Sequence, residues 1–302
     1  FVGRHEVMRL SVEVVDGIPL QVFAATVDTR LDFEDIAGVA ADEREHQLML
    51  RLGELRDDEI DLASGRPYRA RLFRLAADQH VFFFMPHHVV WDGWSFDIFL
   101  RDLNEFYCAR RSGREPRLPQ LPIDYADYAN WHRGWLASGA LDRELDYWAS
   151  QLGGELVPLE LPLDQPRPRL FSHRGDWEEF TIDQATVDSV GRLAAQHRAS
   201  PFMVLLAAWM GFLARVGGQR EITVGAPIQA RHQPQVADLV GCFVNTICLR
   251  QNVDVERPFR DLLLAVRECA LDAYDHQDTP VELIVDRLLQ RRDPNRTPLF
   301  QA

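Results

Sequence analysis

Several features that would assign this chain to a common class of protein are missing from its sequence. None of its apolar runs approaches the roughly 18 residues that span a membrane, and the longest, residues 202–214, predicts a buried helix. Basic residues are also scarce, because 33 Lys and Arg stand against 46 Asp and Glu and leave a net charge of −13. Nucleic-acid binding requires clustered positive charge. We therefore expect neither a membrane nor a nucleic acid as partner.

Cysteine is rare as well. The chain has four, Cys108, Cys242, Cys248 and Cys269, and no C-x-x-C pair. Such spacing favours reduced core residues over a disulfide framework and is typical of a cytoplasmic protein. The sequence starts at Phe1 without a methionine or a signal peptide. We interpret this start as cut, so that a missing segment could still carry a signal.

The remaining composition is that of a folded protein that mixes strands with helices. With 302 residues, 46% of them apolar, the chain is long enough for one large domain or two lobes. Four prolines between residues 156 and 169 exclude a helix interior or a central strand there and predict a connector. We therefore expect an N-terminal lobe over residues 1–165 and a C-terminal lobe over residues 166–302, each of them α/β.

Apolar periodicity predicts the individual elements. Strands are expected at residues 10–15, 19–24, 68–75, 81–85, 177–182, 221–227 and 241–249. Helices are expected at residues 42–55, 96–112, 125–136, 141–152, 184–197, 201–216, 258–274 and 281–289. Asp16-Gly17 predicts a hairpin turn between the first two strands. Ser200-Pro201 predicts an N-cap followed by proline at the first helical position.

Polar residues at the end of the strand predicted for residues 81–85 form a candidate site. His87 and His88 follow that strand, and Asp92 and Gly93 stand just before a helical pattern. A strand-end imidazole can accept or donate a proton at neutral pH, and glycine permits unusual backbone angles or a close approach of ligand. The alternatives are a satisfied core histidine with an N-cap aspartate, or a zinc or iron site. No second ligand cluster at metal-like spacing accompanies the motif.

Six motifs resemble those of the condensation domain of non-ribosomal peptide synthetases, a relative of chloramphenicol acetyltransferase, and they occur in the family's order. They are RHEVMR at residues 4–9 for the family's RHExLR, HHVVWDGWS at 87–95 for HHxxxDGWS, YADYANW at 125–131 for YxDFAxW, GCFVNTICLR at 241–250 for GxFVNTxxxR, HQDTPVE at 276–282 for HQDxPFE and RDPNRTPLF at 292–300 for RDxSRxPLF. The Thr that follows RHExLR in the family is absent here. Val281 replaces the family's Phe, and Pro294 and Asn295 depart from the last motif. The family's first motif and the strands after PLF are missing, so the resemblance implies a domain truncated at both ends.

The resemblance implies both a fold and a reaction. The fold is α/β, with two chloramphenicol acetyltransferase-like sandwich lobes that form a V with a central tunnel. In this family an amine on a downstream arm attacks a thioester on an upstream arm, and a peptide bond forms. Both arms are 4'-phosphopantetheine groups of peptidyl carrier proteins, which are the implied donor and acceptor partners beside an adjoining adenylation region. The domain itself requires no metal, nucleotide or bound cofactor.

The resemblance also assigns roles to the motif residues. His88 corresponds to the histidine of the chemistry, either as general base toward the amine or as the hydrogen-bond acceptor that aims it. Gly93 permits backbone approach, and its amide is expected to face the oxyanion. We weight His87 toward structure over chemistry. Trp94 and Ser95 are expected to provide core packing and an N-cap.

Three further assignments concern supporting residues. Asp92 corresponds to a structural position, and we hypothesise that it pairs with Arg231 across the cleft, because Arg231 follows the strand predicted at residues 221–227. Asn245 is either a cleft residue or a satisfied polar group at a strand end. Arg291, Arg292 and Arg296 are expected on the surface, where one could meet a carrier protein's acidic face.

Related activities remain as alternatives. An epimerisation domain shares HHxxxDG but continues differently after the aspartate, and a cyclisation domain replaces both histidines with aspartates. An ester-forming condensation domain would accept a hydroxyl in place of the amine. A non-catalytic docking module typically loses the histidines, whereas His87 and His88 are both present.

Overall fold

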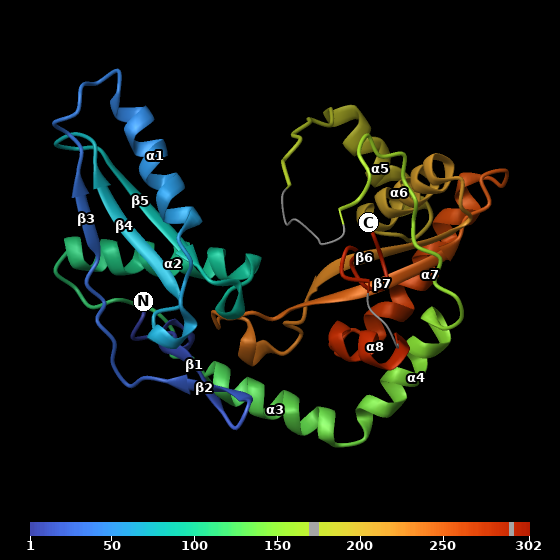
Figure 1. Cartoon of the computed structure of the whole chain (residues 1–302), viewed down its shortest axis with the longest axis horizontal. Helices are drawn as coiled ribbons and strands as arrows, with labels where there is room; N and C mark the ends of the chain where they lie inside the picture. Colours follow the sequence, from blue (N-terminus) through green and yellow to red (C-terminus); the bar gives the residue numbers. More distant parts are fainter. Residues whose placement is uncertain (169–174, 290–292) are drawn as a thin grey trace. The chain divides into compact units, whose positions relative to one another are not determined.

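The apolar run that precedes the two histidines forms a strand at one edge of a three-stranded sheet. The computed structural model describes residues 1–168, 175–289 and 293–302. In it β5 (His80–Pro86) pairs antiparallel with β4 (Tyr68–Arg74), and β4 pairs in parallel with β3 (Asp32–Asp35) (Figure 1). The helix α1 (Arg44–Asp57) lies in the connection from β3 to β4. The strands β4 and β5 are those predicted at residues 68–75 and 81–85.

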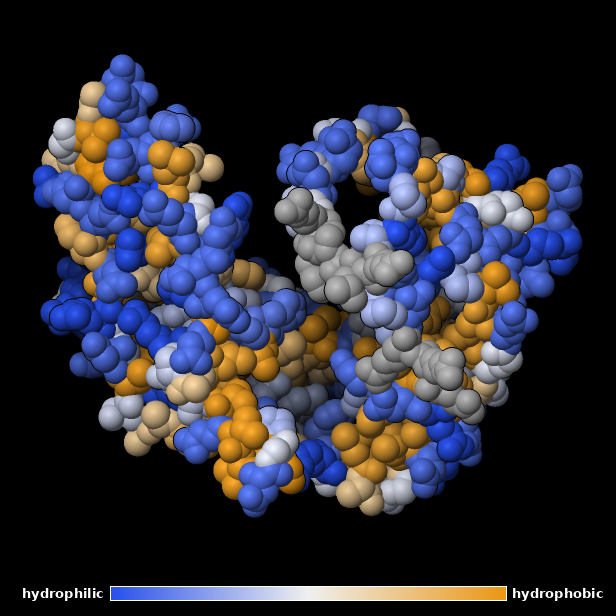
Figure 2. Space-filling model, in the orientation of Figure 1, coloured by the Kyte–Doolittle hydropathy of each residue, from blue (hydrophilic) through white to orange (hydrophobic). Residues whose placement is uncertain are grey.

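A separate hairpin stands near the N-terminus. It consists of β1 (Leu10–Val15) and β2 (Ile18–Phe23), which pair antiparallel. Asp16 and Gly17 have φ angles of 51° and 79°, and two left-handed residues give the turn the twist that a two-residue hairpin loop needs. The hairpin is buried at its base, through Leu10, and carries exposed apolar side chains toward its tip (Figure 2). The prediction from Asp16-Gly17 is confirmed.

The helix after the histidine motif is α2 (Gly93–Arg111), and it starts three residues before the predicted position. The earlier start follows from Asp92, which is the N-cap and accepts the backbone N–H of Ser95 at 2.9 Å. Ser95, the residue expected to cap, instead lies inside the first turn. Beneath the motif, Val90 and Trp91 are buried in one apolar core with residues of α2. This packing holds the start of the helix against the sheet.

The second half of the chain forms a two-stranded antiparallel sheet covered by helices. Its strands are β6 (Glu221–Gln229) and β7 (Val244–Asn252), with α6 packed on β6 and α7 on β7. The helices are α4 (Ala140–Leu152), α5 (Gln184–Gln196), α6 (Pro201–Gly217), α7 (Phe259–Asp275) and α8 (Val281–Leu288). As predicted, α6 begins at an N-cap, Ser200, followed by Pro201, and it ends at Gly218 in the left-handed conformation.

By its internal contacts the chain divides into two units, Phe1–Arg133 with Arg231–Phe243, and Gly134–Ala230 with Val244–Ala302. This division differs from the boundary expected after residue 165. The helix α4 contacts α8 and β7 and contributes Trp148 and Leu152 to the core of the second unit. The helix α3 (Tyr125–Ala137) runs from the first unit into the second.

The strand predicted at residues 177–182 is wrong. The structure has no regular element there, and Trp177 is 92% exposed. None of the described residues pairs with this segment as a strand, and a segment with β-favouring side chains forms a strand only where a partner supplies hydrogen bonds. Among the described residues no single helix has the length and apolar content to cross a membrane, and only the bent pair α5 and α6 satisfies both criteria jointly.

Candidate active site

The two histidines of the motif occupy different environments in the first unit. The ring of His87 is half-buried, and its Nδ1 accepts the backbone N–H of Val89 at 3.1 Å, which closes the 3₁₀ turn η3 (His88–Val90). The backbone N–H of His87 donates to Pro67 O at 2.9 Å. His88 is exposed at the start of this turn, whereas Val90 at its end is buried in the core. His87 thus shapes the turn that presents His88.

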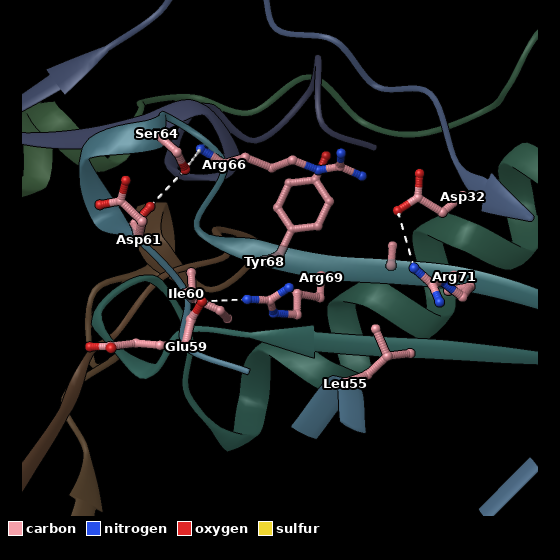
Figure 3. A pocket seen from close by; sticks show the side chains of 11 residues that line it. Asp32, Leu55, Glu59, Ile60, Asp61, Ser64, Arg66, Tyr68, Arg69 and Arg71 are labelled. Atoms are coloured by element: carbon pink, nitrogen blue, oxygen red, sulfur yellow. Dashed lines mark hydrogen bonds and ion pairs between the residues drawn. The ribbon is translucent and has the colours of Figure 1, made fainter. Parts of the chain in front are cut away.

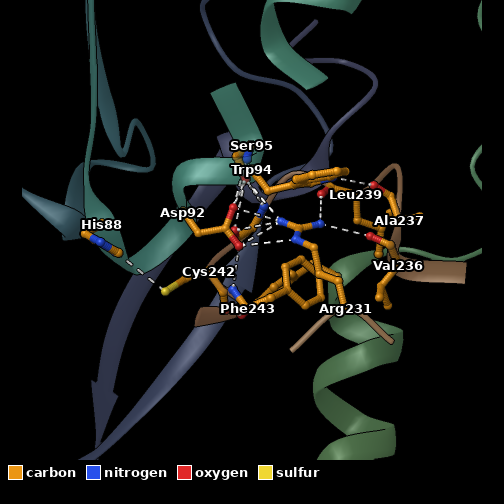
Figure 4. A network of polar contacts seen from close by, with 12 residues as sticks. His88, Asp92, Trp94, Ser95, Arg231, Val236, Ala237, Leu239, Cys242 and Phe243 are labelled. Carbon is orange, nitrogen blue, oxygen red and sulfur yellow. Dashed lines mark hydrogen bonds and ion pairs between the residues drawn. The ribbon is translucent and has the colours of Figure 1, made fainter. Parts of the chain in front are cut away.

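The carboxylate of Asp92 lies at the centre of a buried polar network (Figure 4). Arg231 binds both of its oxygens through Nη2 at 3.0 Å, and its Nε donates to Oδ2 at 3.3 Å. The backbone N–H of Phe243 donates to Oδ2 at 3.1 Å. Both charged side chains are almost completely buried, with 3% and 4% exposed for Asp92 and Arg231. Asp92 is therefore a structural anchor that faces Arg231.

Arg231 is satisfied on every side of its guanidinium group. Its Nη1 donates to Val236 O at 2.9 Å and to Leu239 O at 2.6 Å, and its charge lies 3.9 Å from the centroid of the Phe243 ring. Burial lowers the pKa of Arg231, although Asp92 opposes this effect. The predicted contact of Asp92 with Arg231 is confirmed. The expectation that Arg231 reaches it from the other lobe is wrong, because Arg231–Phe243 belongs to the same unit as Asp92.

The network holds residues 241–243 against the start of α2. Gly241 N–H donates to Ser95 Oγ at 3.2 Å, and Tyr125 Oη donates to Cys242 O at 2.7 Å. A Cβ on Gly241 would lie 2.4 Å from the Tyr125 ring, so the close approach requires glycine. Because residues 241–243 bond to α2 and α3, they do not pair with β6, and β7 starts at Val244 and not at the predicted residue 241. This bonding also places Cys242 beside His88, with Sγ 3.7 Å from Nδ1.

Gly93 is the first residue of α2 and is exposed. Its φ lies outside the left-handed region, so the unusual backbone angle that glycine permits is not used here. Apart from the chain neighbours of Gly93 and the backbone of α2, no heavy atom lies within 4 Å of the position that a Cβ would occupy. Space is therefore open beside the Gly93 backbone, and its N–H, at the first position of a helix, has no acceptor within the helix.

Asn245 lies in the second unit and is satisfied by the protein itself. Its Nδ2 donates to Gln277 O at 2.8 Å and to Thr279 O at 2.7 Å, and its Oδ1 accepts the N–H of Val281 at 3.2 Å. The side chain thus fixes the HQDTPV segment at the start of α8. Of the two interpretations of Asn245, this geometry supports the satisfied polar group at a strand end.

We expect Asn245→Ala to destabilise the chain by about 1–3 kcal/mol, because it leaves two carbonyls and one N–H without their partner. Asn252→Ala is the matched control, since Asn252 is exposed at the far end of the same strand. Urea unfolding of both variants measures the difference, and the control should stay within about 0.5 kcal/mol of the parent. Equal stability of Asn245→Ala and the parent would contradict the role given to Asn245.

The RHExLR motif contributes a buried centre that the sequence did not reveal. Asp102 of α2 is fully buried and accepts from Arg4 Nε at 2.9 Å and His5 Nε2 at 3.1 Å. The next motif residue, Glu6, accepts the N–H of Ala126 at 2.8 Å at the start of α3. Burial opposes ionisation of Asp102, but hydrogen bonds from His5 and Arg101 outweigh it and lower the pKa of Asp102. The motif therefore ties α2 and α3 together.

The stability of the first unit should fall as the pH falls below about 6.5. Burial lowers the pKa of His5, although Asp102 opposes this, and Nδ1 of His5 is buried without a hydrogen-bond partner among the described residues. The unfolded chain therefore binds a proton at a pH where folded His5 does not. The contribution of Asp102, whose pKa is lowered, is lost only as the pH falls below about 4.

This prediction is checked by the free energy of unfolding measured between pH 7 and pH 5. His5→Gln should reduce the slope, by at most about 1.4 kcal/mol per pH unit, the value for one proton. His46→Gln, at an exposed position of α1, should leave the slope unchanged. An unchanged slope in His5→Gln would show that His5 titrates alike in the folded and unfolded chains.

The other predicted positions are placed as follows. Trp94 is partly exposed and its Nε1 donates to Ala237 O at 3.2 Å. Arg296 is largely covered and pairs with Glu160 at 2.6 Å, so it is not the solvated side chain expected. Arg291 and Arg292 lie outside the described residues. Among the residues that the structure describes, no group of three or more His, Cys, Asp or Glu side chains is arranged to hold a metal ion.

A cavity of about 260 Å³ lies apart from these residues in the first unit (Figure 3). Its lining includes the arginines Arg66, Arg69 and Arg71 but none of the predicted site residues. Arg69 and Arg71 are neutralised by Asp58 and by Glu34, and Arg66 lies over the Tyr68 ring. The cavity therefore presents little uncompensated charge to a ligand.

Comparisons with known proteins agree with these motifs. The family model "Condensation domain" matches residues 1–302. A polypeptide of linear gramicidin synthase from Brevibacillus parabrevis is 39% identical over 301 residues, which are 100% of this chain and 6% of that protein. Phosphinothricin tripeptide synthetase PhsC of Streptomyces viridochromogenes is 34% identical over 299 residues, 99% of this chain and 28% of that protein. The chain thus spans a small part of these relatives.

Solved structures share the fold. The X-domain from teicoplanin biosynthesis superposes with a TM-score of 0.89 at 25% identity, over 99% of this chain and 66% of that one. The first condensation domain of the calcium-dependent antibiotic synthetase superposes with a TM-score of 0.72 at 22% identity, over 95% and 66%. A mixed α/β fold with HHxxxDG between the edge strand β5 and the capped helix α2 places the chain in the class of condensation-type domains. Within that class, the chain belongs to the condensation domains of non-ribosomal peptide synthetases.

Proposed function

We propose that this chain forms a peptide bond between a donor acyl thioester and an acceptor aminoacyl thioester, both held on phosphopantetheine arms of carrier proteins. The observation that supports it is the state of His88. Its ring is exposed, its Nδ1 faces Cys242, and none of the described residues forms a hydrogen bond with its Nε2. One ring nitrogen therefore remains open for an incoming amine.

In the proposed reaction the acceptor's α-amine attacks the donor's thioester carbon. The N–C bond forms, the C–S bond breaks, and the upstream arm leaves as a thiolate that takes up the proton lost by the amine. His88 accepts a hydrogen bond or the proton itself at Nε2 and so orients the nitrogen lone pair toward the carbonyl. Thioester aminolysis is favourable, so positioning and charge stabilisation are the main tasks.

The surrounding residues support this step in different ways. The N–H of Gly93, beside open space at the start of α2, is the proposed donor to the oxyanion that develops on the thioester oxygen. His87, Asp92, Arg231 and Asn245 are proposed to act on structure only. Each of them is already bonded to protein groups.

A docking function is the second candidate. A teicoplanin X-domain structure, similar at a TM-score of 0.88 and 25% identity, is a complex with OxyB, so this fold is found with a bound protein. A docking module would leave His88 without a task, whereas an exposed imidazole with an open ring nitrogen suits catalysis. Ester formation and epimerisation remain as rivals within catalysis.

Reconstitution with two loaded carrier proteins separates these functions. The upstream carrier bears an acyl or peptidyl arm, and the downstream carrier bears either an amino acid or the matching hydroxy acid. We expect the chain extended by one residue on the amino-acid arm, detected by mass spectrometry of the carriers. Transfer to the hydroxy acid alone would indicate ester formation, and inversion of a donor residue without transfer would indicate epimerisation. Stable binding of carriers without any product would favour docking.

Carriers from a module with its own adenylation region are the natural choice, because such a region is the proposed neighbour.

A further inference from the structure

A thiol stands directly beside the histidine of the proposed reaction. Cys242 Sγ lies 3.7 Å from His88 Nδ1, within hydrogen-bonding range for sulfur (Figure 4). Cys242 is half-buried and His88 is exposed. A nucleophilic side chain within reach of a base is the arrangement from which covalent acyl transfer starts.

The backbone around Cys242 is held on both sides, so the thiol has a defined place. Gly241 N–H donates to Ser95 Oγ, Phe243 N–H donates to Asp92 Oδ2, and the Cys242 carbonyl accepts from Tyr125 Oη at 2.7 Å. The buried pair of Asp92 and Arg231 fixes this segment against α2. The contacts of Asp92, Ser95 and Tyr125 with residues 241–243 therefore fix Cys242 beside His88.

The other three cysteines lack this arrangement. Cys248 is buried, and burial raises the pKa of its thiol to about 12. Burial also raises the pKa of Cys269. Cys108 lies on α2 with its sulfur 3.7 Å from Asn104 Oδ1, an amide that cannot take up a proton. Thiolate is the reactive form of cysteine, and of the four thiols only that of Cys242 has an imidazole as hydrogen-bond partner.

We infer that Cys242 is a second acceptor for the donor acyl group, with His88 as its base. In this step the Cys242 proton moves to His88 Nδ1, Sγ attacks the thioester carbon, and the bond from that carbon to the arm's sulfur breaks. The leaving thiolate takes the proton back from the imidazolium. One thioester replaces another, so atoms and charge balance without an oxidant or a further reactant. The inference rests on the proposed function in that the donor is a thioester presented at His88.

The test uses the complete chain with an acyl-N-acetylcysteamine thioester and no amine acceptor. Intact-mass measurement should show one acyl group per chain, peptide mapping should place it on Cys242, and neutral hydroxylamine should remove it. Mapping the parent protein requires no variant, so the result does not depend on the folding of a substituted chain. Cys242→Ala should abolish the adduct and Cys108→Ala should keep it. His88→Ala should slow its formation by about 100-fold.

The outcomes are separable from those of the carrier assay. Peptide-bond formation without any acyl group on Cys242 overturns this inference and leaves the proposed function standing. An acyl group on Cys242 in a chain that forms no peptide bond supports the inference and argues against the proposed function. An adduct that maps to another residue, or that forms at the same rate in His88→Ala, also overturns the inference.

Discussion

His88→Ala is expected to lower product formation from two loaded carrier proteins by about 10²- to 10⁴-fold, the range that a positioned acid–base group contributes. The loss should come without a change in stability. The His88 ring is exposed, and its side-chain hydrogen bond within the described residues is the weak one to Cys242. Initial rates of peptidyl transfer and thermal unfolding of the same preparations measure both quantities.

His80→Ala is the matched control for this experiment. His80 is also an exposed histidine and lies at the opposite end of the same strand, β5. The control should retain full transfer. Unchanged product in His88→Ala would remove the role assigned to His88 and favour the docking alternative. A fall in stability together with activity would instead show that the ring supports the fold.

Much of the local structure was predictable from the sequence, because local signals determine it. Asp16-Gly17 specifies a turn through backbone angles that few residues adopt. At the start of α6, Ser200 accepts a backbone N–H of the first turn and Pro201 has no N–H that needs an acceptor. The strand before His87 follows from its β-branched and aromatic side chains. The position of His88 at the end of this strand was therefore predictable. Its exposure depends on the short turn in which Val90 is buried.

The features that could not be predicted depend on contacts between distant parts of the chain. Arg231–Phe243 joins the first unit because its groups bind Asp92 and Ser95, more than 130 residues earlier. In the sequence nothing distinguishes Asp102 from the other charged residues of α2. Its partners, Arg4 and His5, reach it only in the folded chain. Cys242 lies near His88 because residues 231–243 pack against the first unit through these same contacts. The strand predicted at residues 177–182 does not form, because among the described residues no partner strand stands beside its β-favouring side chains.

The buried pair of Asp92 and Arg231 should be the most sensitive part of the scaffold. Asp92→Asn removes the charge that compensates Arg231, and breaking such a buried pair costs about 3–5 kcal/mol. Both side chains are almost fully buried, so solvent cannot replace the lost partner. Urea unfolding measures the loss. Arg56→Gln, which breaks an exposed pair with Asp57, should give no measurable change.

The double variant Asp92→Asn with Arg231→Met tests whether the two residues act as a unit. Removing the second partner also removes the uncompensated charge, so the double variant should lose less stability than the sum of the two single variants. Because the pair holds residues 241–243 beside His88, transfer activity should fall in step with stability across the three variants. The structural assignment of Asp92 is wrong if Asp92→Asn keeps its stability and geometry yet loses turnover. The carboxylate would then act in the reaction itself, through a charge that Asn cannot supply.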